Sequence, residues 1–290
     1  MRGYAHHVIP TVVDYADPDA PRAFTESLRN TGFAVLVNHP LPWELVEGIY
    51  AEWSELFTSG AAMDYLVGAD GQEGYFPPDT SETAKGNDVR DLKEFFHVYP
   101  WSTIYPSEVS DAALRYRDIA CELASTLLGW VDDNTPPEVA ARLSQSIRSM
   151  IEGNTRTLLR VLRYPPLTGD APEGAIRAAA HEDINLLTVL PASDESGLEL
   201  LGTDGEWYAV PCDPGSIAVN CGEMLDLATD GYYPATTHRV VNPTGDAARR
   251  ARMSLPLFLG AADDVVIADG RTASELLAKR LVELRGERAN

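Results

Sequence analysis

One segment, RAAAHEDINLLTVL at Arg177–Leu190, decides how the rest of this chain is interpreted. It ends in an apolar run with a β-branched content that predicts a buried strand, and it carries two possible metal ligands where that run begins. Side chains two residues apart on an extended chain point to the same side, so His181 and Asp183 can face one metal ion. By itself the His-x-Asp pattern is also typical of a capped turn or a polar surface pair.

A third possible ligand follows at His238, in the segment TTHRVV at Thr236–Val241. Two histidines and one carboxylate that leave the other coordination positions open form the facial triad of non-haem iron oxygenases. The sequence therefore indicates an iron site made of His181, Asp183 and His238.

A cation and a hydroxyl then begin another apolar run, RMSLPLFL at Arg252–Leu259. Arg252 and Ser254 are two residues apart and can face the same pocket, where a guanidinium binds a carboxylate through two parallel hydrogen bonds. An arginine at a strand end is also often solvated, as we expect for Arg249 and Arg250. The order His-x-Asp, His, Arg-x-Ser, each beside a predicted strand, favours a functional site.

The two halves of the chain differ in their predicted elements. The first half predicts helices at 21–30, 42–58, 107–130 and 136–150, with an irregular part at 59–106 that is broken by glycine and proline. From Thr155 onward, short apolar runs alternate with turn residues, a pattern typical of an antiparallel barrel or sandwich. Gly197–Gly202 and Trp207–Val210 flank Thr203-Asp204-Gly205 and predict a hairpin. A final helix is predicted at 273–285.

Taken together, these segments resemble the isopenicillin N synthase-like branch of the iron(II)/2-oxoglutarate-dependent dioxygenases. The resemblance runs from about residue 8 to the last helix. Its motifs are IPTVVD at Ile9–Asp14, GFAVLVNH at Gly32–His39, RYPP at Arg163–Pro166, His181-Glu182-Asp183, NCGEML at Asn220–Leu225, His238-Arg239-Val240 and Arg252-Met253-Ser254. The loop at 242–250 is longer than is usual in the family, and a hairpin loop tolerates such extra residues.

The resemblance implies an α+β fold with a mainly β core: a double-stranded β-helix, or jelly roll, with a helical N-terminal layer and a C-terminal helix. We expect one domain, with a helical part at about 1–150, the jelly-roll core at about 151–262 and a closing segment at about 263–290. It implies Fe(II), 2-oxoglutarate and O2 as cofactor and co-substrates, and oxidative decarboxylation to succinate and CO2. Arg252 and Ser254 would bind the distal carboxylate of 2-oxoglutarate, joined by the hydroxyl of Tyr164, which otherwise is a core tyrosine.

The primary substrate is expected to be a small organic molecule, either derived from an amino acid or a secondary metabolite, that is hydroxylated, desaturated or cyclised. Aromatic side chains at 75–101 form either an ordinary small core or, as the family implies, the border of the substrate pocket. Arg160 and Arg163 either hold a substrate carboxylate or face outward from the barrel. Candidate substrate contacts are therefore Tyr75, Phe76, Phe95, Phe96, Arg160 and Arg163.

Three other functions fit parts of the same sequence. A 2-oxoglutarate-independent iron oxidase of the isopenicillin N synthase type would use Arg252 and Ser254 to hold substrate. A metal-dependent hydrolase would need a general base beside the metal, and Glu182 points away from the ion if this segment is extended. A non-enzymatic binding protein on the same fold is the third, although all of the expected ligands are intact.

Composition limits the partners. The 290 residues carry a formal charge of −21, which argues against binding nucleic acid or an anionic membrane surface. The cysteines Cys121, Cys212 and Cys221 are widely spaced and odd in number, so they suggest no disulfide framework and favour a reducing cytoplasm. No apolar run is long enough to span a bilayer. We expect a cytoplasmic monomer or homodimer.

Overall fold

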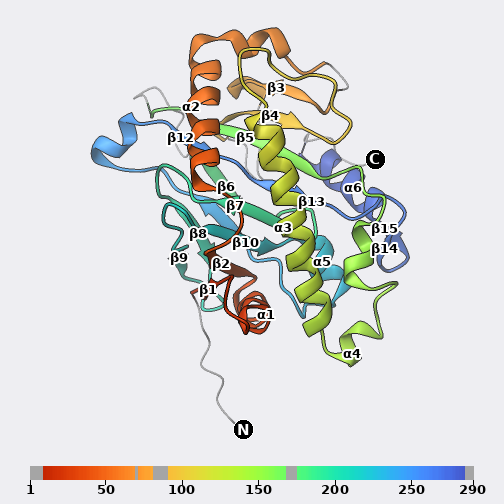
Figure 1. Cartoon of the computed structure of the whole chain (residues 1–290). Coiled ribbons are helices and arrows are strands. Elements are labelled where there is room, and N and C mark those ends of the chain that lie inside the picture. Colours follow the sequence, from red (N-terminus) through yellow and green to blue (C-terminus); the bar gives the residue numbers. More distant parts are fainter. Residues whose placement is uncertain (1–8, 69–70, 81–90, 168–174, 285–290) are drawn as a thin grey trace.

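The computed structural model describes residues 9–68, 71–80, 91–167 and 175–284. The strands of its larger sheet come from widely separated parts of the chain (Figure 1). Neighbouring strands in this sheet are β1 (Val12–Asp14), β2 (Phe33–Val37), β10 (Ile217–Cys221), β7 (Leu187–Pro191), β13 (Leu257–Leu259), β5 (Leu158–Tyr164), β4 (Glu94–Val98) and β3 (Gly74–Phe76), with β12 (Arg252–Ser254) paired to β5. The strands β1 and β2 pair in parallel, and the other pairs are antiparallel.

A smaller sheet faces the larger one and completes the jelly roll. Its strands, in order, are β6 (Ala178–His181), β11 (His238–Val240), β8 (Leu198–Leu201) and β9 (Trp207–Ala209). Apolar side chains of both sheets pack together: Phe95 and Tyr164 of the larger sheet share a cluster with Ala178 and Val240 of the smaller. The predicted hairpin is confirmed, since Leu201 of β8 pairs with Trp207 of β9.

Helices cover the other face of the larger sheet. They are α1 (Ala20–Thr31), α2 (Trp43–Ser59) and α3 (Ala112–Asn134), and Figure 1 shows α2 and α3 in front of the strands. Their apolar stripes and the facing strands form the largest buried cluster, which includes Trp53, Tyr116, Val161 and Val189. The shorter helices are α4 (Pro137–Ala140), α5 (Glu223–Ala228) and α6 (Ala273–Leu284), and a small hairpin of β14 (Val266–Ala268) and β15 (Arg271–Thr272) precedes α6.

The segment Arg177–Leu190 links the two sheets. It forms β6 in the smaller sheet, crosses over through Glu182–Leu186, and enters the larger sheet as β7. The crossing is fastened to the turn after β10, where the N–H of Glu223 donates to the carbonyl of Asp183 and the N–H of Met224 donates to that of Asn185. The predicted buried strand is thus confirmed as β7, and Asp183 lies on the crossing rather than within a strand.

Two predicted features are wrong. The part expected to be irregular, 59–106, contains β3 and β4, and β4 is buried on both faces, so its sequence EFFHV lacks the alternation that identifies a strand. The helix expected at 136–150 ends at Ala140 and is followed by a 3₁₀ turn, Ile147–Ile151. There the N–H of Ile147 donates to the carboxylate of Asp132, a bond that competes with helical hydrogen bonding.

None of the helices in the described ranges combines the length and the apolar character needed to cross a bilayer.

Gly222 tests how tightly the crossing is packed. A β-carbon at this position would lie 2.1 Å from Oδ1 of Asn185 and 2.3 Å from its carbonyl oxygen. We expect Gly222→Ala to lower the free energy of unfolding by about 1–3 kcal/mol, because the crossing must shift to admit the methyl group. Urea denaturation followed by circular dichroism measures this loss.

Gly48, inside α2, is the matched control, since no atom lies within 4 Å of its β-carbon position. Gly48→Ala should stabilise the protein by about 0.5–1 kcal/mol, because alanine loses less backbone entropy than glycine in a helix. A Gly222→Ala protein as stable as the wild type would contradict this account of the crossing.

Candidate active site

Two histidines face each other at the ends of adjacent strands. His181 is the last residue of β6 and His238 the first of β11, and the two are directly paired across the smaller sheet. Each ring directs Nδ1 at the carbonyl two residues earlier, at 2.7 Å to Ala179 and 3.0 Å to Thr236. A carbonyl oxygen only accepts, so Nδ1 carries the proton in both rings and Nε2 keeps its lone pair for a metal.

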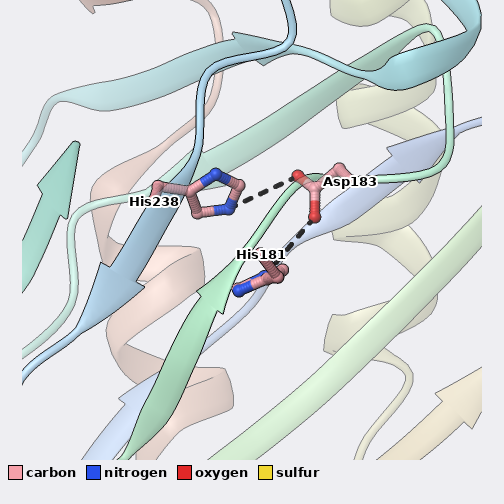
Figure 2. Close-up of side chains that lie close together, drawn as sticks. All are labelled: His181, Asp183 and His238. Atoms are coloured by element: carbon pink, nitrogen blue, oxygen red, sulfur yellow. Dashed lines mark ion pairs between the residues drawn. The ribbon is translucent and has the colours of Figure 1, made fainter. Parts of the chain in front are cut away.

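Asp183 completes the group from the crossing (Figure 2). Its Oδ1 lies 3.8 Å from Nε2 of His181, and its Oδ2 lies 3.8 Å from Nε2 of His238. Burial by itself would raise the pKa of Asp183, but the two histidines and two hydrogen bonds lower it overall. The carboxylate is therefore ionised, as a metal ligand must be.

Two buried side chains orient this carboxylate. The hydroxyl of Thr188 on β7 donates to Oδ2 of Asp183 at 2.6 Å, and Nδ2 of Asn220 on β10 donates to the same atom at 2.9 Å. The Thr188 hydroxyl in turn accepts a hydrogen bond from Nδ2 of Asn185 at 2.8 Å. Both donors come from the larger sheet, so the packing of the two sheets fixes the position of a ligand on the loop between them.

The donor set suits Fe(II). One atom from each of His181, Asp183 and His238 lies within 4.8 Å of the others, and two imidazole nitrogens with one carboxylate oxygen make the facial-triad set. Burial and the nearby His238 lower the pKa of His181 to about 4, so its ring is neutral near pH 7. Its side chain is nevertheless 39% exposed, which leaves one side of the group accessible.

The structure brings Arg252, Ser254 and Tyr164 together on the inner face of the larger sheet. Arg252 pairs with Tyr164 and Ser254 with Leu162, and paired residues of antiparallel strands point to the same side. All three candidate side chains are buried, and the guanidinium carbon of Arg252 lies 5.3 Å from the centre of the Tyr164 ring. Nε of Arg252 donates to the carbonyl of Glu195, whereas its Nη1 is buried without a hydrogen-bond partner among the described residues.

The candidate substrate residues divide between the two faces of the larger sheet. Phe76, Phe95 and Arg160 are in register with Leu162 and Tyr164 on the inner face. Phe76 and Phe95 stack with ring centres 4.8 Å apart, and the guanidinium carbon of Arg160 lies 4.2 Å from the centre of Phe95. These three side chains border the interior of the jelly roll.

The other three lie on the opposite face. Phe96 packs under Trp53 of α2 in the core, and Tyr75 donates its hydroxyl to Glu94 at 2.6 Å. Arg163 forms an ion pair with the same Glu94. This Tyr75–Glu94–Arg163 group is buried beneath the helices, on the side of the sheet away from the metal ligands.

Several buried polar residues near this site were not predicted from the sequence. No role was assigned to Arg177, which is fully buried, or to Thr188. The buried ion pair of Asp91 and Lys93 was also missed, and Oδ1 of Asp91 accepts the N–H of Ala179 in β6 at 3.0 Å. In the sequence these residues are marked only by a charge or a hydroxyl beside an apolar run. That pattern does not show which face of a sheet the side chain occupies.

Comparisons with known proteins agree with this geometry. The model of the 2OG-Fe(II) oxygenase superfamily matches residues 156–261, and that of the non-haem dioxygenase in morphine synthesis N-terminal region matches residues 12–117. A crystal structure of a candidate oxygenase from Shewanella oneidensis is 46% identical, with a TM-score of 0.85, over 96% of this chain and 99% of that one. The chain belongs to the 2OG-Fe(II) oxygenase superfamily.

More distant relatives cover most of the same length. Gibberellin 3-beta-dioxygenase 1 of Arabidopsis thaliana is 28% identical over 89% of this chain and 72% of its own. Neurospora crassa T7H, solved in complex with alpha-KG (2-oxoglutarate), shares the fold at 19% identity, with a TM-score of 0.78 over 97% of both chains. The protein is thus an Fe(II)/2-oxoglutarate-dependent dioxygenase with a facial triad and the double-stranded β-helix fold.

Thr188 gives a test of how the carboxylate ligand is oriented. We expect Thr188→Val to weaken metal binding by about 10- to 100-fold, because Asp183 loses its shorter hydrogen bond while the shape of the side chain is kept. Isothermal titration of the apoprotein with Mn(II) measures the dissociation constant. Thr188→Ser keeps the hydroxyl and should bind the metal nearly as the wild type does, whereas equal affinity of the Val variant would refute this role.

Proposed function

We propose that His181, Asp183 and His238 hold Fe(II) through Nε2, a carboxylate oxygen and Nε2, and that Arg252, Ser254 and Tyr164 bind the distal carboxylate of 2-oxoglutarate. The buried guanidinium of Arg252, with Nη1 unpartnered among the described residues, carries this proposal. A buried cationic donor without a partner is costly, and a carboxylate ligand removes that cost through charge-assisted hydrogen bonds. Ser254 and Tyr164 add hydroxyl groups on the same face.

When bound, Fe(II) and 2-oxoglutarate would activate O2: one oxygen atom would enter succinate as the co-substrate loses CO2, and the other would accept two electrons from the second substrate. The protein contributes placement and exclusion of water. Thr188 and Asn220 hold Asp183 in its ligating orientation. The carbonyl of Ala179 fixes the tautomer of His181, and the carbonyl of Thr236 fixes that of His238. The apolar cluster around Phe95 and Leu162 shields Tyr164 from solvent.

We propose that the primary substrate is a small organic molecule, derived from an amino acid or a secondary metabolite, which is hydroxylated, desaturated or cyclised. Phe76 and Phe95 would give its pocket an apolar wall, and Arg160 would place positive charge on that wall. The gibberellin dioxygenase named above, whose name refers to a small organic substrate, supports this class. Tyr75, Phe96 and Arg163 would pack on the opposite, helix-covered face of the same strands.

The deciding experiment is an anaerobic titration of the Fe(II)-loaded protein with 2-oxoglutarate, followed by visible absorbance. We expect a charge-transfer band that saturates in the wild type. In Arg252→Ala the apparent affinity should fall at least roughly thirtyfold, because a buried charged hydrogen bond is lost. Once co-substrate binding is established, release of succinate provides a screen for primary substrates.

Arg249→Ala is the matched control, since that side chain is 85% exposed and lies only three residues earlier. Its titration should match the wild type. Unchanged affinity in Arg252→Ala would show that another group binds the distal carboxylate, and absence of the band with iron bound would argue that 2-oxoglutarate does not chelate the metal.

A further inference from the structure

Arg177 is a fully buried cation just before β6, four residues ahead of the ligand His181. Its backbone N–H donates to Oδ1 of Asn242, and its Nη2 donates to the carbonyl of Arg250 at 2.9 Å. Two further donors of the same guanidinium, Nε and Nη1, are buried without a hydrogen-bond partner in the described part of the chain. Most buried polar groups are paired, so these unused donors indicate a missing partner.

A second buried guanidinium lies near the same aromatic ring. The guanidinium carbons of Arg177 and Arg252 lie 6.0 Å and 5.3 Å from the centre of the same Tyr164 ring. Burial, and then the positive charge of Arg252, lower the pKa of Arg177. Arg252 also has an unpartnered donor, Nη1, so three buried N–H-bearing atoms of two neighbouring cations lack acceptors among the described residues.

The nearby carboxylates are already engaged elsewhere. Glu195 forms an ion pair with Arg250, and Oδ1 of Asp194 accepts the N–H of Met253 at 2.9 Å. Within the described ranges, neither Arg177 nor Arg252 forms an ion pair with a carboxylate. Two buried cations repel each other and have lost their hydration. An anion that binds both therefore offsets much of this unfavourable electrostatic free energy.

We propose that Arg177 is a second guanidinium of the co-substrate site, which binds the distal carboxylate of 2-oxoglutarate together with Arg252. This inference rests on the proposed role of Arg252. Arg252 supplies Nη1, and Arg177 supplies either Nε or Nη1, because these two atoms lie on opposite edges of its guanidinium and only one of them can reach the same carboxylate. The pair makes the site selective for a 2-oxo acid with a second carboxylate.

Two ligands and one variant test this selectivity. 2-Oxopentanoate has the carbon chain of 2-oxoglutarate without the distal carboxylate, and both bind the metal through the same 1-carboxylate and 2-keto groups. We expect Arg177→Met to weaken binding of 2-oxoglutarate to the Fe(II)-loaded, anaerobic protein by roughly ten- to hundredfold. Binding of 2-oxopentanoate should change less than about threefold, since the difference arises only at the distal carboxylate.

The stability of the ligand-free protein gives an independent readout. Removing one of two buried, poorly paired cations should raise the melting temperature of apo Arg177→Met, while the further rise caused by 2-oxoglutarate shrinks. Arg156→Met, which removes an arginine from an ion pair with Asp263, should leave the preference between the two acids unchanged. If Arg177→Met does not fold, Arg177→Lys keeps the charge without the planar fork and should show an intermediate loss of preference.

The outcomes separate this inference from the assignment of Arg252. Loss of 2-oxoglutarate binding in Arg252→Ala together with unchanged selectivity in Arg177→Met would overturn only the role of Arg177. Equal weakening of both acids, with a lower melting temperature of the apoprotein, would show that Arg177 only supports the fold. Unchanged binding in both variants would overturn both assignments.

Discussion

The passage of the chain from the smaller sheet to the larger, through Glu182–Leu186, is the constraint on which the site depends. His181 is the last residue of β6 in the smaller sheet, and Thr188 lies in β7 of the larger sheet. Asp183 lies on the crossing between them. A loop by itself would leave a carboxylate mobile. Here two side-chain donors from the larger sheet and backbone hydrogen bonds from the turn after β10 fix it, so a precise ligand is obtained from an irregular segment.

The jelly roll also buries charged groups among apolar side chains. One face of the larger sheet is covered by helices and filled with aliphatic and aromatic side chains, and the other carries Arg252, Tyr164, Thr188 and Asn220 between apolar clusters. Polar groups in such surroundings are costly unless they are paired. Asp183 is paired within the protein, whereas Arg177 and Arg252 keep donors that have no partner among the described residues, and these donors suit the anionic ligand proposed above.

Neighbouring side chains of one strand divide between the two faces of the larger sheet. On β4, Phe96 faces the helices and packs under Trp53, while its neighbour Phe95 faces the interior beside Tyr164. The same alternation on β5 places Arg163 with Glu94 beneath the helices and Arg160 on the inner face. Because side chains alternate across a strand, residues of the same type an odd number of positions apart lie in different surroundings.

The sequence by itself predicted the candidate ligands and the type of fold. The His-x-Asp, His and Arg-x-Ser patterns stand beside apolar runs, and the hairpin at 203–205 is marked by its turn residues, because these signals are local. Only the tertiary structure decided that β4 is a strand, that the chain after Pro136-Pro137 leaves the helix at Ala140, and which of the candidate substrate residues share a face with Tyr164. Only the tertiary structure, too, placed Arg177 and Arg252, residues 75 positions apart in the chain, near the same Tyr164 ring. Burial on both faces removes the alternation that reveals a strand, and the partner of a buried charge depends on long-range pairing that no short segment encodes.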